Sequence, residues 1–93
     1  MESFRCQFGE VELTDERETH IFQFHPDIRP YRKYFASALE KPEFIRRSKY
    51  DPLVLLLYKP VSKRKNLVIV IKTNKRNFVL TAYLTDKIPR KSL

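Results

Sequence analysis

NLVIVIKTNKRNFVLTAYLT, residues 66–85, decides the fold, because it predicts two β-strands joined by a short basic turn. Its apolar runs, 66–72 and 77–85, are rich in Val, Leu, Ile and Tyr, the residues typical of strands. A third such run, LVLLLYK at 53–59, precedes them and is connected by the basic segment PVSKRKN. Connections this short predict successive hairpins, and therefore an antiparallel meander.

Upstream of these strands the sequence predicts two helices. Thr14 suits a helix N-cap, and acidic residues follow it in the first turn, where the helix dipole favours them. We expect the first helix to end near Phe24, because Pro26 interrupts the pattern. Pro30 suits the first turn of a second helix, which continues to Lys41.

Two short segments, 2–8 and 43–48, each suit a further strand. We therefore expect a single α+β domain over residues 1–93, with two N-terminal helices packed on a three- to four-stranded antiparallel β-meander. The middle strands are apolar on both faces, so something besides water is expected to cover the second face in part.

The composition excludes several classes of protein. Cys6 is the only cysteine, which excludes a disulfide within the chain, fits a reducing cytoplasm and suits a small buried apolar side chain. No apolar run approaches the roughly 20 residues that span a bilayer, and no signal peptide is visible, so no membrane partner is expected. A single glycine excludes a glycine-rich phosphate loop.

No cofactor and no metal site are expected. His20 and His25 are five residues apart, whereas four would place them on one face of a helix. On a helical wheel they fall on opposite sides of the apolar stripe, so they are not expected to serve the same site. For each histidine, a structural role and a functional role both remain open.

Charge is divided unequally along the chain. Residues 1–28 contain two arginines and seven acidic residues, whereas the remaining 65 residues contain 17 Lys and Arg and only four acidic residues. This division favours an anionic partner for the C-terminal part of the molecule. RNA is the first candidate, and an acidic protein is the second. A charged surface that serves only solubility is the remaining alternative.

The last predicted strand has an unusual face. Alternation places Val79, Thr81, Tyr83 and Thr85 together, so three hydroxyl groups are expected side by side. A solvated face would be expected to mix Lys, Glu and Ser. We therefore expect this face to form part of a site.

These residues suffice for RNA cleavage without a metal. The reaction requires a group that takes the proton of the 2′-hydroxyl, donors for the charge on the phosphorane, and a proton for the leaving oxygen. A histidine, an arginine and the hydroxyls of Ser, Thr and Tyr can supply all three.

The motifs THIFQFHPDI, ALEKPEFIRRSKYDP and FVLTAYLTDKI, in this order, resemble small phage- and bacteria-associated domains of the barnase–EndoU–colicin–RelE-like (BECR) nuclease superfamily. The resemblance covers roughly residues 11–88. It implies helices followed by an antiparallel meander, and a metal-independent, toxin-like endoribonuclease. One departure is Phe24, which stands where many members carry an arginine.

Carried over residue by residue, the resemblance implies a catalytic set made of His20, Arg47, Ser48, Thr81, Tyr83 and Thr85. His25 also matches, but its proline neighbour favours a structural role. The basic and aromatic segments between the strands predict an RNA-binding set made of Tyr58, Lys59, Lys63, Arg64, Lys65, Lys72, Lys75 and Arg76. Two alternatives stay open: an RNA-binding module without catalysis, and a domain that binds an acidic partner such as an antitoxin or inhibitor.

Overall fold

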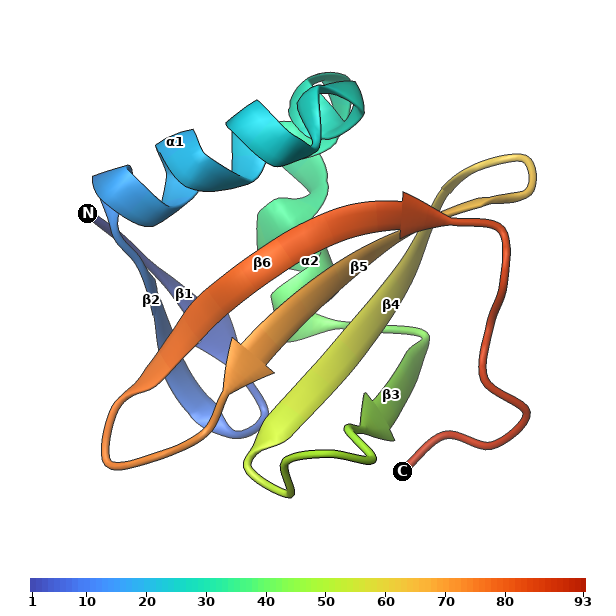
Figure 1. Ribbon diagram of the computed structural model, residues 1–93. Helices are drawn as coiled ribbons and strands as arrows, with labels where there is room; N and C mark the ends of the chain where they lie inside the picture. The colour runs from blue at the N-terminus through green and yellow to red at the C-terminus, as the bar shows by residue number, and fades with distance from the viewer.

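A six-stranded mixed sheet forms the frame of the molecule, and all residues from 1 to 93 are described by this computed structural model (Figure 1). The strands lie in the order β1-β2-β6-β5-β4-β3. The elements along the chain are β1 (Glu2–Cys6), β2 (Gly9–Leu13), α1 (Asp15–Phe24), the 3₁₀ helix η1 (Pro26–Tyr34), α2 (Phe35–Glu40), β3 (Phe44–Arg47), β4 (Val54–Ser62), β5 (Lys65–Lys72) and β6 (Asn77–Thr85).

The predicted three- to four-stranded antiparallel meander behind two N-terminal helices is wrong. A hairpin, β1–β2, precedes α1, and β2 runs parallel to β6 through the pairs Val11↔Asn77 and Glu12↔Phe78. β6 is the last strand of the β3–β6 meander, and it pairs with β5 along one edge only. β2 pairs with the start of its other edge. The sheet is therefore mixed and six-stranded, although the domain is α+β.

The helices follow local sequence chemistry. The Thr14 side chain caps α1 by accepting a hydrogen bond from the Arg17 backbone N–H at 3.1 Å, as predicted. The helix ends at Phe24, and a 3₁₀ segment begins at Pro26. The predicted second helix at 31–41 is only partly correct, because η1 occupies its first half. Pro30 lies inside η1 and has no N–H to donate to an α-helical ladder.

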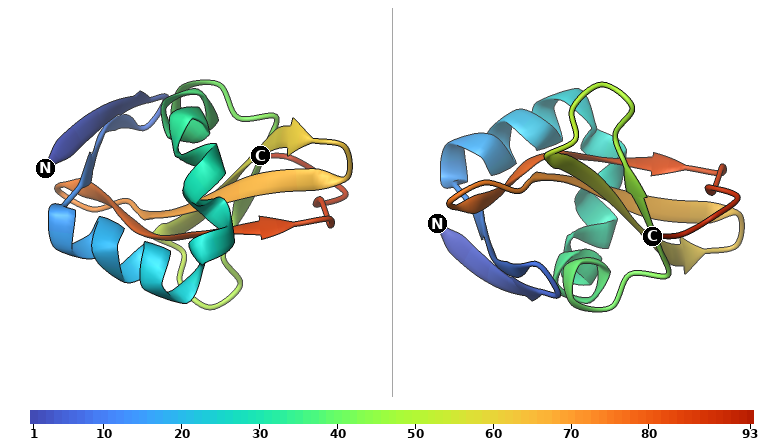
Figure 2. Two further views of the ribbon diagram at one scale, coloured as in Figure 1. Left: turned by 90° about the horizontal axis from the view of Figure 1, so that it is seen from above. Right: turned by 90° about the horizontal axis from the view of Figure 1, so that it is seen from below.

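The sheet curls around α2, which contacts β1, β4 and β5 (Figure 2). Figure 1 looks onto the other side of the sheet, with α2 behind it. The main core fills the space between the sheet and the helices, and Phe35 is among its largest fully buried side chains. Cys6 is half-buried and packs against this core. None of the helices combines the length and apolar character needed to cross a membrane.

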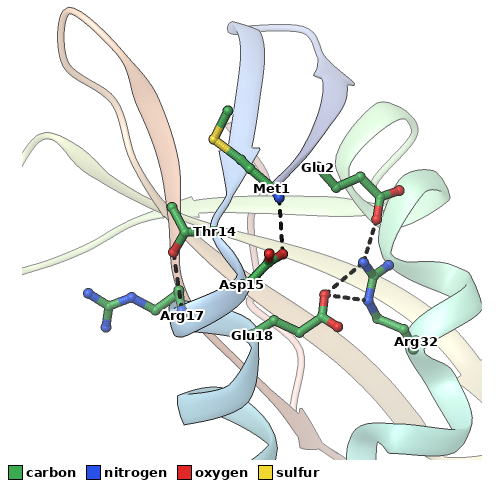
Figure 3. Close-up of polar contacts among 7 residues, drawn as sticks. All are labelled: Met1, Glu2, Thr14, Asp15, Arg17, Glu18 and Arg32. Atoms are coloured by element: carbon green, nitrogen blue, oxygen red, sulfur yellow. Dashed lines mark hydrogen bonds and ion pairs between the residues drawn. The ribbon is translucent and has the colours of Figure 1, made fainter.

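Arg32 connects β1, α1 and η1 (Figure 3). Its Nη2 lies 2.6 Å from Glu2 Oε1 and 2.9 Å from Glu18 Oε1, and its guanidinium lies over the rings of Phe4 and Phe35. Partial burial opposes the charge of Arg32, but the hydrogen bonds and charges of the two glutamates outweigh it and raise the pKa of Arg32. Arg32, which belongs to the basic part of the chain, thus forms ion pairs with two glutamates of the acidic segment 1–28.

Candidate functional site

The face of the sheet that points away from α2, here called the outer face, carries a second, smaller cluster of apolar side chains. Leu56, Tyr58, Val68 and Val70 form its buried centre, and partly buried side chains surround them. Residues directly opposite each other on paired strands share a face. By the strand register, the outer face contains Phe44 and Arg46 of β3, Val54, Leu56 and Tyr58 of β4, Val68 and Val70 of β5, and Leu80, Thr81 and Tyr83 of β6.

Two rows of side chains cross the strands on this face. The first row runs Phe44, Tyr58, Val68 and Tyr83, and the second runs Arg46, Leu56, Val70 and Thr81. Val68 lies between the two tyrosines in the first row, and its side chain is 0% exposed although the cluster around it consists of strand residues only. Aromatic rings therefore do part of the covering, a role that tyrosine can fill while its hydroxyl stays near the water.

A β-bulge in β6 changes the predicted hydroxyl face. Val70 pairs with Thr81, whereas Ile71 pairs with Val79, so Leu80 is an extra residue in β6. Val79 consequently points into the main core. Thr81 and Tyr83 lie on the outer face opposite Val70 and Val68, and Thr85 follows in alternation opposite Asn66. The three hydroxyl residues stay together as predicted, but Val79 does not join them.

His25, and not His20, lies beside this face. His25 is the C-cap of α1, and its half-buried ring lies 6.2 Å from the ring of Tyr83. His20 is exposed, and its ring packs at 4.6 Å on the ring of Phe24. Five helical residues correspond to a rotation of roughly 140° between the two histidines. The structure thus brings His25 to Tyr83 of the last strand and places His20 on another side of α1.

Tyr83 has a perturbed environment. Burial raises its pKa from the ordinary value, the neighbouring Tyr58 raises it further, and the positive charge of Arg46 lowers it in part. The first two causes prevail, so Tyr83 keeps its proton at neutral pH and can act as a hydrogen-bond donor. Tyr58 and Arg46 are therefore both near enough to Tyr83 to influence the charge on its hydroxyl.

The structure separates Arg47 and Ser48 from this group. Arg47 pairs with Leu55, whose side chain belongs to the main core, so Arg47 is on the opposite face from Tyr83. Its Nη1 donates to the Pro52 carbonyl at 2.6 Å. The Ser48 hydroxyl accepts a hydrogen bond from the Tyr50 N–H at 3.1 Å and so supports the turn before β4.

Arg46 is the residue that the sequence reasoning missed. It is exposed and lies on the outer face, in the same row as Thr81. Alternation was the available signal, since Arg46 and Phe44 share a face and Phe44 pairs with Tyr58. Alternation identifies Arg46 as the arginine on the outer face only when the register of β3 against β4 is known.

The predicted RNA-binding side chains fall into two groups. Lys63, Arg64 and Lys65 are exposed around the β4–β5 turn and Lys75 is exposed in the β5–β6 turn, and no ion pair includes them. These two turns lie at opposite ends of the sheet (Figure 1).

The remaining three cations have protein partners. Lys72 pairs with Asp51 at 2.8 Å, Arg76 pairs with Glu12 at 3.1 Å, and Lys59 Nζ donates to the Lys41 carbonyl at 3.1 Å. The cations of the predicted RNA-binding set that have no protein partner therefore lie mainly at the β4–β5 end of the sheet.

No group of three or more His, Cys, Asp and Glu side chains is arranged so that it could hold a metal ion. Comparison with protein-family models, with curated proteins and with solved structures finds no match.

Proposed function

We propose that this protein is a metal-independent endoribonuclease whose site lies on the outer face around Tyr83. The observation that carries the proposal is the contact between the rings of His25 and Tyr83, on a face that also presents Arg46. A titratable imidazole, a neutral phenol and a guanidinium are the three kinds of group that the reaction requires. The resemblance of THIFQFHPDI and FVLTAYLTDKI to the BECR superfamily supports the same chemistry.

Each residue has a defined role in this proposal. His25 takes the proton of the 2′-hydroxyl, since imidazole exchanges a proton readily near neutral pH. The 2′-oxygen then forms a bond to phosphorus, and the bond from phosphorus to the 5′-oxygen breaks. Arg46 stabilises the charge on the phosphorane, and Tyr83 donates its proton to the leaving 5′-oxygen. The products are a 2′,3′-cyclic phosphate and a 5′-hydroxyl, and the proton on His25 restores Tyr83.

One observation favours a second candidate, an RNA-binding module without catalysis. Five surface cavities are lined by other parts of the molecule, and none of them includes Arg46, Tyr58 or Tyr83. A shallow face with aromatic side chains suits the stacking of single-stranded bases. Stacking alone requires neither His25 nor a proton on Tyr83.

The test compares the two histidines of α1. Purified wild-type protein, His25→Ala and His20→Ala are incubated with total tRNA and mRNA in EDTA, and the products are separated on a denaturing gel. We expect wild type and His20→Ala to cleave RNA, and His25→Ala to lose on the order of 10²- to 10⁴-fold in rate. Circular dichroism checks that both variants fold.

The remaining outcomes have clear meanings. The prediction that His20 is the general acid or base stays a prediction, and loss of cleavage in His20→Ala alone would support it. If wild type binds RNA in a salt-dependent way but does not cleave it, the RNA-binding module is the correct reading.

A further inference from the structure

One surface cavity adjoins the proposed site but is not part of it. Its volume is about 460 Å³, within the range of small-molecule pockets. It lies between η1, the β4–β5 turn and the end of β6, and its lining includes Asp27, Tyr31, Arg64, Lys65, Thr85 and Asp86. Nothing in the proposed reaction uses these residues.

Two positions connect the cavity with the proposed site. Asp27 is two residues beyond His25, and Thr85 is two residues beyond Tyr83 on the same strand. Two residues of a strand span roughly 7 Å. An RNA strand with its reacting phosphate at Tyr83 therefore reaches the cavity within about one nucleotide.

The cavity wall carries equal numbers of positive and negative side chains, and these form no ion pairs. Arg64 and Lys65 provide two positive charges and Asp27 and Asp86 provide two negative charges, and none of the four takes part in an ion pair. A simple anion would be repelled by the carboxylates, and a simple cation by the basic pair. The lining suits a ligand that carries both an anionic group and hydrogen-bond donors.

A nucleotide is such a ligand. Its phosphate can bind Arg64 and Lys65, and its base can stack on Tyr31, whose ring is half-buried in the cavity wall. A carboxylate accepts hydrogen bonds but donates none, and it recognises a base through an exocyclic amino group. Cytosine has such a group where uracil has a carbonyl oxygen, which a carboxylate repels.

We propose that this cavity binds a ribonucleotide of the RNA strand next to the proposed site and prefers bases that carry an exocyclic amino group, so that cytosine binds better than uracil. The inference rests on the proposed function for its ligand class. Its specificity comes from Asp27 and Asp86, which the proposed catalysis does not require.

The test uses two hexaribonucleotides that cannot be cleaved, 2′-O-methyl C₆ and 2′-O-methyl U₆, titrated into isotope-labelled protein. We expect C₆ to shift the backbone NMR signals of Tyr31, Thr85 and Leu84, which also lines the cavity. C₆ should bind roughly 10-fold more tightly than U₆, as expected for about 1.4 kcal/mol from one good base contact. Asp86→Asn and Asp27→Asn are expected to reduce this preference. Glu40→Gln, which removes the same charge from an exposed site on α2, serves as the control and should leave it unchanged.

The outcomes separate this inference from the proposed function. If the hexamers shift Tyr83 and Arg46 but leave Tyr31, Leu84 and Thr85 unchanged, the cavity is not a nucleotide site, although the outer face binds RNA. Equal affinity for C₆ and U₆, or an unchanged preference in both aspartate variants, overturns the proposed specificity. If neither group of signals shifts, both the inference and the proposed function are wrong.

Discussion

The two faces of strands β3–β6 are both apolar, but they are covered in different ways. On the inner face, Leu55, Leu57 and Ile69 pack against other buried side chains of the main core, beneath η1 and α2. On the outer face, Val68 is equally buried within a cluster of strand residues only, in which Tyr58 and Tyr83 lie beside it. The expected cover for the second face is therefore supplied by the sheet's own side chains.

This difference explains where chemistry is possible. A face covered by helices excludes water, and a polar group there would need a buried partner. A face covered by its own aromatic rings has a rim at which hydroxyl and guanidinium groups meet water. Tyr83 and Arg46 lie on this second kind of face, next to the end of α1.

The largest expected effect compares two neighbouring leucines of β4. Leu57 lies in the main core and is 0% exposed, whereas Leu56 lies on the outer face and is 7% exposed. We expect Leu57→Ala to lower the free energy of unfolding by about 4 kcal/mol and Leu56→Ala by about 2 kcal/mol, because the outer face can relax toward solvent. Urea denaturation measures both. Equal losses would contradict the distinction between the faces and would indicate that a second molecule covers the outer one.

The next comparison uses the two adjacent arginines of β3. Arg46 is on the outer face and Arg47 is on the inner side, where it contacts the Pro52 carbonyl. We expect Arg46→Ala to reduce RNA cleavage by roughly 10²- to 10³-fold, as for loss of a group that stabilises transition-state charge. Arg47→Ala should change the rate little. The reverse result in a cleavage assay would place the site on the other face.

Tyr83→Phe tests the proton donor without changing the shape of the outer face. We expect a loss of about 10²-fold in cleavage rate, at the lower end for general acid catalysis. The raised pKa of Tyr83 predicts that its hydroxyl stays protonated above pH 10.0, where an ordinary tyrosine is half ionised. NMR of ¹³Cζ-labelled tyrosine follows this ionisation directly.

The raised pKa also has a consequence for stability. The folded protein holds this proton more tightly than the unfolded chain, so its contribution is complete below pH 10.0 and is lost as the pH rises through the folded-state pKa. Tyr83→Phe should remove that part of the alkaline loss of stability. If Tyr83 has a pKa of 10.0 or lower, its side chain is more exposed to solvent than its half-buried position indicates.

The smallest effect is expected at the exposed edge of the outer face. The hydrogen bond from Lys72 lowers the pKa of Asp51 below its ordinary value of 3.8. A lowered folded-state pKa stabilises the fold above the unfolded pKa, and this contribution is lost as the pH falls through the folded-state value. Asp51→Asn should therefore slightly lower the melting temperature at neutral pH, and the difference from wild type should disappear in acid.

High salt should also reduce that difference, since the Lys72–Asp51 pair is partly exposed to solvent. A difference that persists in acid would contradict a role for the charge of Asp51, because a protonated carboxyl group and the amide of Asp51→Asn can both still accept the hydrogen bond from the Leu53 N–H, at 2.9 Å.

The sequence by itself determined the local elements. The residue types typical of strands predicted strands at 43–48, 53–59, 66–72 and 77–85, close to the observed β3–β6, and Thr14 and Pro26 set the limits of α1. These signals are local, because they depend on the conformational preferences of a few neighbouring residues. They also kept Thr81, Tyr83 and Thr85 together as candidates for the site.

Only the tertiary structure decided which side chains meet. The pairing of β2 with β6 connects residues more than 60 positions apart, and the alternation of GEVEL at 9–13 does not reveal its partner. One extra residue at Leu80 reverses the face of Val79, and the register of β3 selects Arg46 over Arg47. A shift of one residue moves a side chain to the other face of a sheet. The choice between adjacent residues therefore depends on long-range pairing, which the local pattern does not contain.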